Sequence, residues 1–404
     1  MLPSLVFYCQ HSVGTGHLTR TVALLRHLRA RFDVTFITGG ALPPDMPGLG
    51  GSDLQKTVQL PPVGVDETGR MVSRDRRRPL LRALAERRRV LIDTYHAVKP
   101  HVLMIELFPS GRRKFLSELE PVLEETLCGG AIRPIVCCSV RDIGLSHDDQ
   151  HHEYDSEAAR VLGAYFDAVL VHCDPSFARL EESIAQDVQI RVPVYYTGFV
   201  HDPNQAVPRR LRTRPGSIIV SAGGGLFGET LLRKAIEAHA WLPAGSRPPL
   251  TVIGGPLLPE DGWRRLRALA RGRPDVDVRR SVPNLVWELS QAGGSISQCG
   301  CNIAMDLLHS RVPALVVPLG DDPRDEQVKR ARRLESLGAL RVLSNSDLTV
   351  PRLAAEMISL LAFRPSAMAL NLKGAEQTAE IVQQLFEQGV VVGAPGMARR
   401  DMSA

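Results

Sequence analysis

The sequence predicts an α/β protein built from two parallel α/β halves. Strand-like apolar runs alternate with helical patterns along almost the whole chain, which favours parallel α/β architecture over all-α or all-β folds. Both halves open with an apolar run, a glycine-bearing turn and a helix, starting near residues 4 and 217. A polar, proline-bearing stretch at 201–216 has no apolar period and reads as the linker between them. We expect domains at 1–205 and 206–375, followed by a tail at 376–404.

Composition supports two cytoplasmic domains. The chain has 404 residues, 44% of them hydrophobic, which is enough for two cores. No apolar run reaches the roughly 18–20 residues that span a bilayer, and we expect no signal peptide. The seven cysteines follow neither a disulfide framework nor a zinc pattern, which fits a reducing compartment. The net charge of +5 is mild.

The expected elements follow in chain order. Strands of the first half are expected at 4–9, 33–38, 101–107, 134–140, 167–172 and 194–197. Helices are expected between them, for example at 18–30 and 84–98. Strands of the second half begin near 217, 249, 276, 293 and 313, and the tail contains a helix at 377–388. Ligands of open α/β sheets bind beyond the carboxyl ends of strands, so residues directly after these runs are the candidate site residues.

The first such motif is Val-Gly-Thr-Gly-His at 13–17. Gly14 and Gly16 allow a tight turn and a close approach of another molecule to the backbone. The spacing is not GxGxxG and no acidic residue follows at the distance a dinucleotide site needs. His17 is a candidate functional residue because it follows a strand end, and a structural place at the helix N-terminus is the alternative.

The second motif is a similar glycine-bearing turn at the start of the second half. Gly223, Gly224 and Gly225 follow an apolar run and precede a helix. Such a turn exposes backbone N–H groups that can donate hydrogen bonds to phosphate oxygens. A tight structural connection is the alternative.

The third and strongest motif is the stretch 297–334, which reads as strand end, glycine turn, helix, strand and polar loop. Its marked residues are Gln298, Cys299, Gly300, Cys301, Asn302, Asp306, Pro313, Pro318, Glu326 and Gln327. This stretch resembles the nucleotide-sugar-binding segment of GT-B glycosyltransferases. Most of the chain resembles glycosyltransferase family 28, which includes the peptidoglycan N-acetylglucosaminyltransferase, and Gly-Thr-Gly-His at 14–17 resembles the N-terminal loop of that family. The resemblance is vague between 45 and 130.

The resemblance implies the GT-B fold, with two Rossmann-like domains facing across a cleft and a tail helix that packs back on the first domain. The first domain would bind the acceptor and the second the nucleotide sugar. Asp306, expected on the first turn of a helix, would accept the ribose hydroxyls, and Glu326 and Gln327 would reach the sugar. The helix N-terminus near Gly300 would face the diphosphate. The complete expected donor set is Gly16, Gly223, Gly224, Gly225, Val282, Gln298, Cys299, Gly300, Cys301, Asn302, Asp306, Glu326 and Gln327.

Two departures from the family pattern leave the nucleobase open. The histidine that contacts phosphate in the family is Gln298 here, and the ribose-binding glutamate is Asp306. Cys299 and Cys301 are expected to be small packing residues, with a metal site as the alternative. Gly-Asp-Asp-Pro at 320–323 resembles an acidic metal motif, but its place before Glu326 argues against that role. We expect no metal and no cofactor, with the nucleotide-diphosphate sugar as co-substrate.

Sugar transfer to a hydroxyl needs a base for the acceptor proton, and His17 is the candidate because an imidazole titrates near working pH. By resemblance, a carboxylate after a later strand of the first domain holds that histidine. Glu106 stands at this place, and Asp142 after the next strand is the second candidate. An ordinary strand-end carboxylate is the alternative for Glu106. The expected reaction is an inverting transfer.

The resemblance therefore predicts a hexosyltransferase that uses a nucleotide-diphosphate sugar, with UDP expected, and a small-molecule, carrier-bound or lipid-linked acceptor. A nucleotide-sugar epimerase or hydrolase and a non-catalytic sugar-nucleotide-binding protein remain alternatives. The segment 69–89 carries nine arginines and two acids. This segment is either a solvated helix face or a site that attracts an anionic partner. The second interpretation includes peripheral contact with the inner face of the membrane. It has no aromatic residues for stacking, and nucleic acid is not expected.

Overall fold

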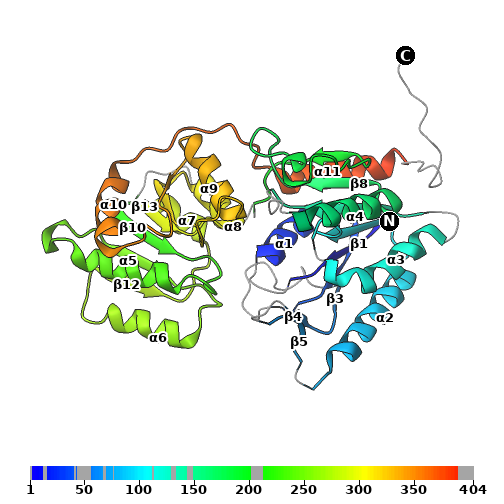
Figure 1. Cartoon of the computed structure of the whole chain (residues 1–404), viewed down its shortest axis with the longest axis horizontal. Coiled ribbons are helices and arrows are strands. Elements are labelled where there is room, and N and C mark those ends of the chain that lie inside the picture. Colours follow the sequence, from blue (N-terminus) through cyan, green and yellow to red (C-terminus); the bar gives the residue numbers. More distant parts are fainter. Residues whose placement is uncertain are drawn as a thin grey trace, which may run out of the picture.

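The computed structural model describes residues 2–11, 16–40, 42, 56–66, 70–75, 77–111, 113–128, 133–142, 149–201 and 213–389. Its two lobes each contain a twisted sheet with helices around it (Figure 1). Gly14, the centre of the expected linker, the expected domain boundary at 205–206 and the end of the tail lie outside the described residues. None of the helices within the described ranges is both long and apolar enough to cross a membrane.

The first lobe holds a seven-stranded parallel sheet in the order β3-β2-β1-β6-β7-β8-β9. Its strands are β1 (Ser4–Cys9), β2 (Asp33–Thr38), β3 (Thr57–Gln59), β6 (Val102–Glu106), β7 (Ile135–Val140), β8 (Ala168–Val171) and β9 (Val194–Tyr196). Its helices are α1 (Gly16–Leu28), α2 (Leu80–Val98), α3 (Leu116–Cys128) and α4 (Asp149–Tyr165). A small antiparallel hairpin of β4 (Val63–Val65) and β5 (Met71–Ser73) lies beside α2.

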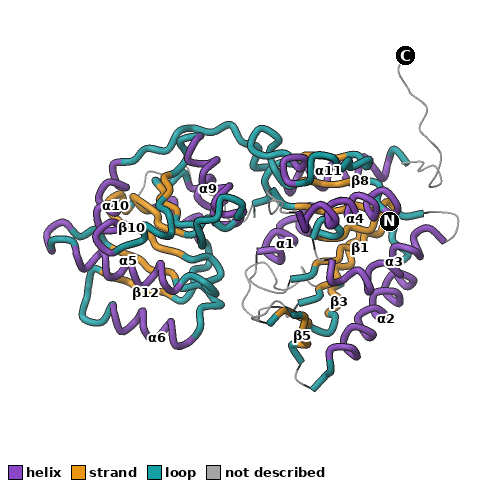
Figure 2. Tube along the Cα trace, in the orientation of Figure 1, coloured by secondary structure: helices purple, strands orange, loops and turns teal. Residues whose placement is uncertain are grey.

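The second lobe holds a six-stranded parallel sheet in the order β12-β11-β10-β13-β14-β15. Its strands are β10 (Arg214–Ser221), β11 (Leu250–Ile253), β12 (Val276–Arg279), β13 (Ala292–Ser297), β14 (Ala314–Val316) and β15 (Arg341–Val342). Its helices are α5 (Glu229–Trp241), α6 (Glu260–Leu269), α7 (Leu285–Gln291), α8 (Cys301–Ser310), α9 (Glu326–Ser336) and α10 (Val350–Ala362). Figure 2 shows strands and helices alternating along both lobes.

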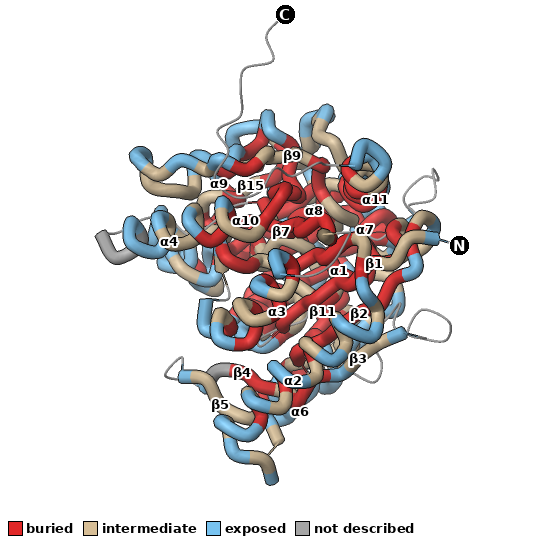
Figure 3. Tube along the Cα trace, turned by 90° about the vertical axis from the view of Figure 1, so that its right-hand side faces the viewer, coloured by how far each residue is buried: buried red, intermediate tan, exposed pale blue. Residues whose placement is uncertain are grey.

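The central strands form because helices cover both faces of each sheet. Parallel strands covered on both faces read as near-continuous apolar runs. All six residues of β7 are buried, as are Leu5–Cys9 of β1. Figure 3 shows buried strands in the middle and exposed outer faces on the surrounding helices.

Each sheet reverses its direction of winding next to its first strand. In the first lobe this happens between β1 and β6, and in the second between β10 and β13. The connections that leave such neighbouring strands diverge, which opens a crevice at their carboxyl ends where α/β proteins bind ligands. The glycine turn before His17 follows β1 and Glu106 ends β6, while Gly223 follows β10 and Gln298 follows β13. The candidate residues of both lobes therefore lie at the two switch points.

Helix α9 ties the second lobe to the first. Glu326, Arg330 and Arg333 lie along one face of α9, because residues three to four apart point the same way. Glu326 pairs with Arg141, and Arg333 donates a 2.7 Å hydrogen bond to the carbonyl oxygen of Phe177. These contacts fix one face of α9 against the ends of the first sheet.

The final helix, α11 (Gly374–Glu387), packs on the first lobe (Figure 1). Its apolar residues Ala379, Val382 and Leu385 share a core cluster with β1 and α1. Arg31, three residues after the end of α1, donates a 2.5 Å hydrogen bond to Gln383. The chain thus crosses from the first lobe to the second and returns.

Several boundaries differ from the sequence expectation. Helix α2 begins at Leu80 rather than at 84, and α11 begins at Gly374 rather than at 377. Strand β10 begins at Arg214, inside the stretch expected to be linker. The β4-β5 hairpin and β3 were not expected, and they fall in the part of the chain where the resemblance is vague.

Candidate functional site

His17 and Glu106 meet at the switch point of the first sheet. His17 is the second residue of α1, and its Nδ1 lies 2.7 Å from the Oε1 atom of Glu106. The carboxylate is fully buried, whereas the imidazole keeps 14% of its surface exposed. A carboxylate can only accept a hydrogen bond, so Nδ1 carries the proton and Nε2 keeps its lone pair. The pair has the arrangement of a base and the group that orients it.

Arg20 completes this cluster and was missed by the sequence analysis. It lies one helical turn after His17 and is only 5% exposed. Its Nη2 contacts Oε1 of Glu106 and lies 3.4 Å from Nδ1 of His17. A buried carboxylate needs such a partner, because an uncompensated buried charge is strongly destabilising. The i, i+3 spacing of His17 and Arg20 was the available signal.

The backbone beyond Glu106 turns sharply. Leu107 adopts the left-handed conformation with φ = 60°, which is uncommon for a bulky residue. Its N–H still donates to the carbonyl oxygen of Ser139 at 2.8 Å, which continues the pairing of β6 with β7. Strained residues of this type concentrate at functional sites. The turn redirects the chain from Glu106 into the wall of a cavity described below.

Asp142, the second candidate partner of His17, is placed elsewhere. It is fully buried and forms a two-point ion pair with Arg330 of α9, with distances of 2.6 Å to Nε and 3.0 Å to Nη2. Nη1 of Arg330 donates to the carbonyl oxygen of Cys299 at 2.9 Å. Asp142 therefore links β7 of the first lobe to α9 and to the turn before α8.

The N-terminus of α8 faces α1 across the two lobes. Nδ2 of Asn302 donates a 3.4 Å hydrogen bond to the carbonyl oxygen of Gly16. The N-cap residue Gly300 offers no side chain to the first N–H groups of the helix. Burial raises the pKa of the Cys299 and Cys301 thiols to about 12, which fits small packing residues rather than nucleophiles.

The glycine turn after β10 requires glycine for two separate reasons. Gly223 and Gly225 have positive φ angles of 60° and 90°. A Cβ atom on Gly225 would also lie 2.2 Å from the carbonyl oxygen of Gly254. The carbonyl oxygen of Gly224 accepts a 2.8 Å hydrogen bond from Leu257, which fixes the turn to the loop after β11. Gln298 fixes it from the other side, donating to the carbonyl oxygen of Phe227 at 3.2 Å.

Asp306 was expected on the first turn of its helix, and this expectation is wrong. Because α8 begins at Cys301, Asp306 is in the second turn. Its Oδ1 lies 3.6 Å from Nε2 of His201, a residue in the segment that leaves the first lobe. Asp306 is thus within reach of both lobes.

The remaining expected donor residues lie at the start of α9 and just before α7. Glu326 pairs with Arg141, and the side-chain oxygen of Gln327 accepts from the backbone N–H of Leu319 at 3.3 Å. Val282 is half-buried and packs on the core beside α7. The acidic loop has structural partners: Asp321 accepts from the backbone of Asn345 and Ser346, and Asp322 pairs with Arg324.

A cavity of about 710 Å³ lies in the first lobe, and its lining includes Leu107, the residue after Glu106. Its wall is mainly apolar and includes Leu107, Phe108, Phe115, Val161 and Leu162. Charged side chains stand at its edge, among them Arg113 over the ring of Tyr154 at 4.6 Å and Arg141. Arg141 thus connects this cavity to Glu326 of the second lobe.

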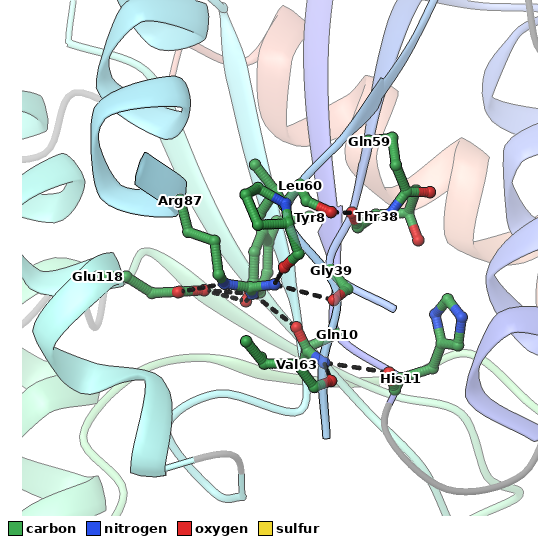
Figure 4. A network of polar contacts seen from close by, with 11 residues as sticks. Tyr8, Gln10, His11, Thr38, Gly39, Gln59, Leu60, Val63, Arg87 and Glu118 are labelled. Carbon is green, nitrogen blue, oxygen red and sulfur yellow. Dashed lines mark hydrogen bonds and ion pairs between the residues drawn. The ribbon is translucent and has the colours of Figure 1, made fainter. Parts of the chain in front are cut away.

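One arginine of the segment 69–89 is part of the core, so the two interpretations offered for that segment are wrong for Arg87 (Figure 4). Its guanidinium is fully buried and donates to Glu118 at 2.6 and 2.7 Å, to Gln10 at 2.6 Å and to the carbonyl oxygen of Gly39 at 2.8 Å. Gln10 in turn donates to the carbonyl oxygen of His11 at 3.0 Å. The network fixes the chain directly ahead of the first glycine turn.

The sequence analysis missed the residues that act across the lobes. Arg141 stands beside Asp142 and Arg330 lies in an arginine-rich helix, so neither had a distinctive signal. His201 had one, because it is a lone histidine at the start of the expected linker. The polar, proline-bearing stretch that it begins nevertheless predicts a linker.

Comparisons with known proteins agree with this architecture. Residues 269–385 match the family model described as the glycosyltransferase family 28 C-terminal domain. The UDP-N-acetylglucosamine–N-acetylmuramyl-(pentapeptide) pyrophosphoryl-undecaprenol N-acetylglucosamine transferase of Chromohalobacter salexigens is 26% identical over 172 residues, which is 42% of this chain and 45% of that protein. The chain thus matches less than half of the length of this curated relative.

Two solved structures resemble nearly the whole chain. The MurG structure of Acinetobacter baumannii has a TM-score of 0.57 at 16% identity and covers 95% of this chain and 100% of its own. The spinosyn rhamnosyltransferase SpnG, complexed with thymidine diphosphate, has a TM-score of 0.52 at 18% identity and covers 96% of both chains. At such identities the likeness establishes the fold. The chain therefore has the GT-B fold, and its residues 269–385 are similar to the glycosyltransferase family 28 C-terminal domain.

Proposed function

We propose that this protein is an inverting, metal-independent glycosyltransferase that moves a sugar from a nucleotide-diphosphate sugar to an acceptor hydroxyl. The observation that carries the proposal is the His17–Glu106 pair, which stands opposite the N-terminus of α8. It supplies an oriented base on one side of the interface between the lobes. The other side supplies backbone N–H groups suited to a diphosphate.

The donor would bind the second lobe. The uncapped N-terminus of α8 and the glycine turn at 223–225 would face the diphosphate, and Asp306 would accept hydrogen bonds from the ribose. The curated relative is named for a UDP-sugar, whereas the SpnG structure contains thymidine diphosphate. We propose a UDP-sugar, the donor named in the curated relative.

The reaction balances with these groups alone. The acceptor oxygen forms a bond to the anomeric carbon while the bond from that carbon to the diphosphate oxygen breaks. The electron pair leaves with the diphosphate, whose charge the α8 amides and the glycine turn would stabilise. The acceptor proton passes to Nε2 of His17, and Glu106 holds the resulting imidazolium through Nδ1.

The acceptor would occupy the cavity whose lining includes Leu107, one residue after Glu106. A volume of about 710 Å³ falls in the usual range for drug-sized ligands, and its wall is mainly apolar. These features favour an acceptor with an apolar body and a hydroxyl near His17. Both a small aglycone and the apolar part of a lipid-linked acceptor have this character.

The proposal is tested by incubating the purified chain with UDP-glucose, UDP-N-acetylglucosamine and dTDP-glucose, each with a panel of apolar hydroxylated acceptors. We expect release of nucleoside diphosphate that depends on an acceptor and persists in EDTA. Release that proceeds equally without any acceptor would point to a hydrolase instead. Nucleotide binding without turnover, after an acceptor screen that includes polyprenyl-diphosphate sugars, would point to a binding protein.

A further inference from the structure

Two side chains of helix α1 share the buried carboxylate of Glu106. Its Oε1 atom lies 2.7 Å from Nδ1 of His17 and also contacts Nη2 of Arg20. His17 and Arg20 stand one helical turn apart, and Nδ1 and Nη2 are separated by 3.4 Å. An imidazole and a guanidinium thus meet at one acceptor oxygen, so the net charge of the three residues depends on the protonation of His17.

These three residues are electrically neutral together when the imidazole of His17 is neutral. The arginine stays protonated, and the carboxylate that it contacts supplies the matching negative charge. The Glu106 side chain has no exposed surface and that of Arg20 is 5% exposed, so solvent screens their charges little. A proton on His17 would add an uncompensated positive charge at a buried place, which is unfavourable. Without Arg20 the preference reverses, because a protonated imidazole would then neutralise the carboxylate.

The titratable neighbours that the structure describes around these three residues leave the charge balance unchanged, because they are uncharged at neutral pH. Burial, with a smaller contribution from Arg20, lowers the pKa of His172 to about 3. Burial, followed by the Glu106 carboxylate, raises the pKa of the Cys138 thiol in β7 well above its usual range. On the side of the second lobe, burial raises the pKa of Cys301 to about 12. Arg20 therefore already disfavours protonation of one imidazole in its surroundings.

Arg20 also lies close to the second lobe. Its charge acts on the thiol of Cys301, the first residue of α8. Asp142 and Arg330 act on the same thiol, but they pair with one another, and Arg141 pairs with an acid of α9. The guanidinium of Arg20 thus stands between the histidine and the helix N-terminus that would face the diphosphate.

We propose that Arg20 is a positioning residue of the transfer, which keeps Glu106 ionised and His17 a free base at neutral pH. Acting through these two residues, it makes proton uptake by His17 favourable only when a negative charge arrives nearby. The departing diphosphate at the N-terminus of α8 supplies that charge, so release of the leaving group favours transfer of the acceptor proton. The inference rests on the proposed function, because it takes His17 as the base. It adds a third residue to that base and assigns it a role in the pH dependence.

The first readout does not need turnover. In the full chain labelled with 15N-histidine, nitrogen chemical shifts distinguish a neutral ring from an imidazolium, and the signal missing in His17→Gln identifies His17. In wild type at pH 7, Nε2 of His17 should be unprotonated. In Arg20→Met most of the His17 rings should be imidazolium at that pH. The midpoint of the His17 titration should rise by at least about one pH unit, the usual effect of a nearby charge.

Two further variants separate charge from packing. Arg20→Lys retains the positive charge, so the midpoint of its His17 titration should lie closer to that of wild type than to that of Arg20→Met. Arg26→Met removes a positive charge from the last turn of the same helix, about 9 Å further along its axis. This variant is the matched control, and its His17 ring should titrate as in wild type.

The second readout is the pH profile of acceptor-dependent transfer. In Arg20→Met, kcat at pH 7 should fall at least about tenfold and should recover in part between pH 7 and pH 9, because raising the pH frees the blocked base. Arg20→Lys should lose less, and Arg26→Met should keep the wild-type profile. A purely structural role for Arg20 would instead lower kcat by the same factor at every pH.

The inference is overturned if His17 is already an imidazolium in wild type at pH 7, a result that does not depend on the folding of any Arg20 variant. It is also overturned if the His17 titration is the same in wild type and Arg20→Met, or if the loss of kcat in that variant does not diminish at alkaline pH. Absence of transfer by wild type with every donor and acceptor would instead overturn the proposed function, even where the titration of His17 shifts as expected.

Discussion

The imidazole of His17 and the carboxylate of Glu106 lie 2.7 Å apart although 89 residues separate them in the chain. They meet because β1 and β6 are neighbours in the first sheet, with Tyr8 opposite Ile105. Glu106 ends β6 one position later, and α1, the next described element after β1, begins at the same edge. The pair is thus a consequence of strand order, and the first two predictions concern it.

His17→Ala should lower the rate of sugar transfer by about 10²- to 10⁴-fold, the usual contribution of a general base. Donor affinity should stay within about twofold, because the donor is expected to bind the other lobe. The measurement is acceptor-dependent release of nucleoside diphosphate, together with calorimetric titration of the donor. His27→Ala, near the end of the same helix, is the control and should keep full activity. Full turnover in His17→Ala would refute the assignment of the base.

Glu106→Gln should reduce both turnover and stability, for separable reasons. The amide no longer fixes the proton on Nδ1, and Arg20 is left buried against a neutral group. Breaking such a buried pair costs about 3–5 kcal/mol of unfolding free energy. The double variant Glu106→Gln with Arg20→Met should recover much of the stability, measured by denaturant unfolding, but none of the activity. Recovery of activity along with stability would show that Glu106 has only a structural role.

Much of this site could be predicted from the sequence because its residues directly follow strands. Long buried strands such as β1 and β7 produce apolar runs that local reasoning finds, and their ends mark His17, Glu106 and the glycine turn at 223–225. The start of α8 near Gly300 agrees with the expectation, yet Asp306, five residues after Cys301, lies in the second turn and not in the first.

Contacts between the lobes could not be predicted in this way. Asp142 follows a strand just as Glu106 does, yet it pairs with Arg330, which is 188 residues away. No local pattern distinguishes these two carboxylates, because the difference depends on which helix of the second lobe packs there. His201 was assigned to a spacer for the same reason.

The buried pair of Asp142 and Arg330 should couple the stability of the lobes. Arg330→Met leaves Asp142 buried without its partner, and the expected loss is about 3–5 kcal/mol in denaturant unfolding. Adding Asp142→Leu should restore part of it, because two apolar groups avoid the uncompensated charge. Arg332→Met, an exposed neighbour on α9 paired with Glu335, should change stability by less than about 0.5 kcal/mol. If Arg330→Met and Arg332→Met lowered the unfolding free energy equally, the pair of Asp142 and Arg330 would not be the contact that couples the stability of the lobes.

Filling the apolar cavity should weaken the acceptor and spare the donor. Ala158 lines the cavity from α4, so Ala158→Trp removes part of the 710 Å³. We expect the KM for an apolar acceptor to rise at least about tenfold, since one buried apolar contact of this size is worth 1–3 kcal/mol. The dissociation constant of the nucleotide should not change. Ser156→Trp points the same side chain outward from the same helix and serves as the control. Loss of donor affinity in Ala158→Trp alone would place the donor, not the acceptor, in this cavity.

His172 should make the fold sensitive to mild acid. It is buried between the hydroxyls of Ser139 and Thr197, at 2.7 and 2.9 Å, and burial lowers its pKa to about 3. The unfolded chain, with an ordinary histidine pKa of about 6.5, therefore binds more protons than the folded chain below that pH. Stability contributed by the neutral ring is complete above about pH 6.5 and is lost as the pH falls, by up to about 1.4 kcal/mol per pH unit.

The measurement is the unfolding free energy of wild type and His172→Gln at intervals between pH 7 and pH 5, above the range where most carboxylates titrate. His172→Gln should be less stable than wild type at pH 7, and the difference should narrow as the pH falls. The exposed His152 pairs with Asp187, and this contact raises the pKa of His152. Its charged form therefore stabilises the folded chain at pH values below the pKa of His152 in the unfolded chain, which is the opposite pH dependence to that of His172. His152→Gln should therefore leave the acid-induced loss intact or slightly larger. A constant difference between wild type and His172→Gln across this range would show that the pKa of His172 is the same in the folded and the unfolded chain.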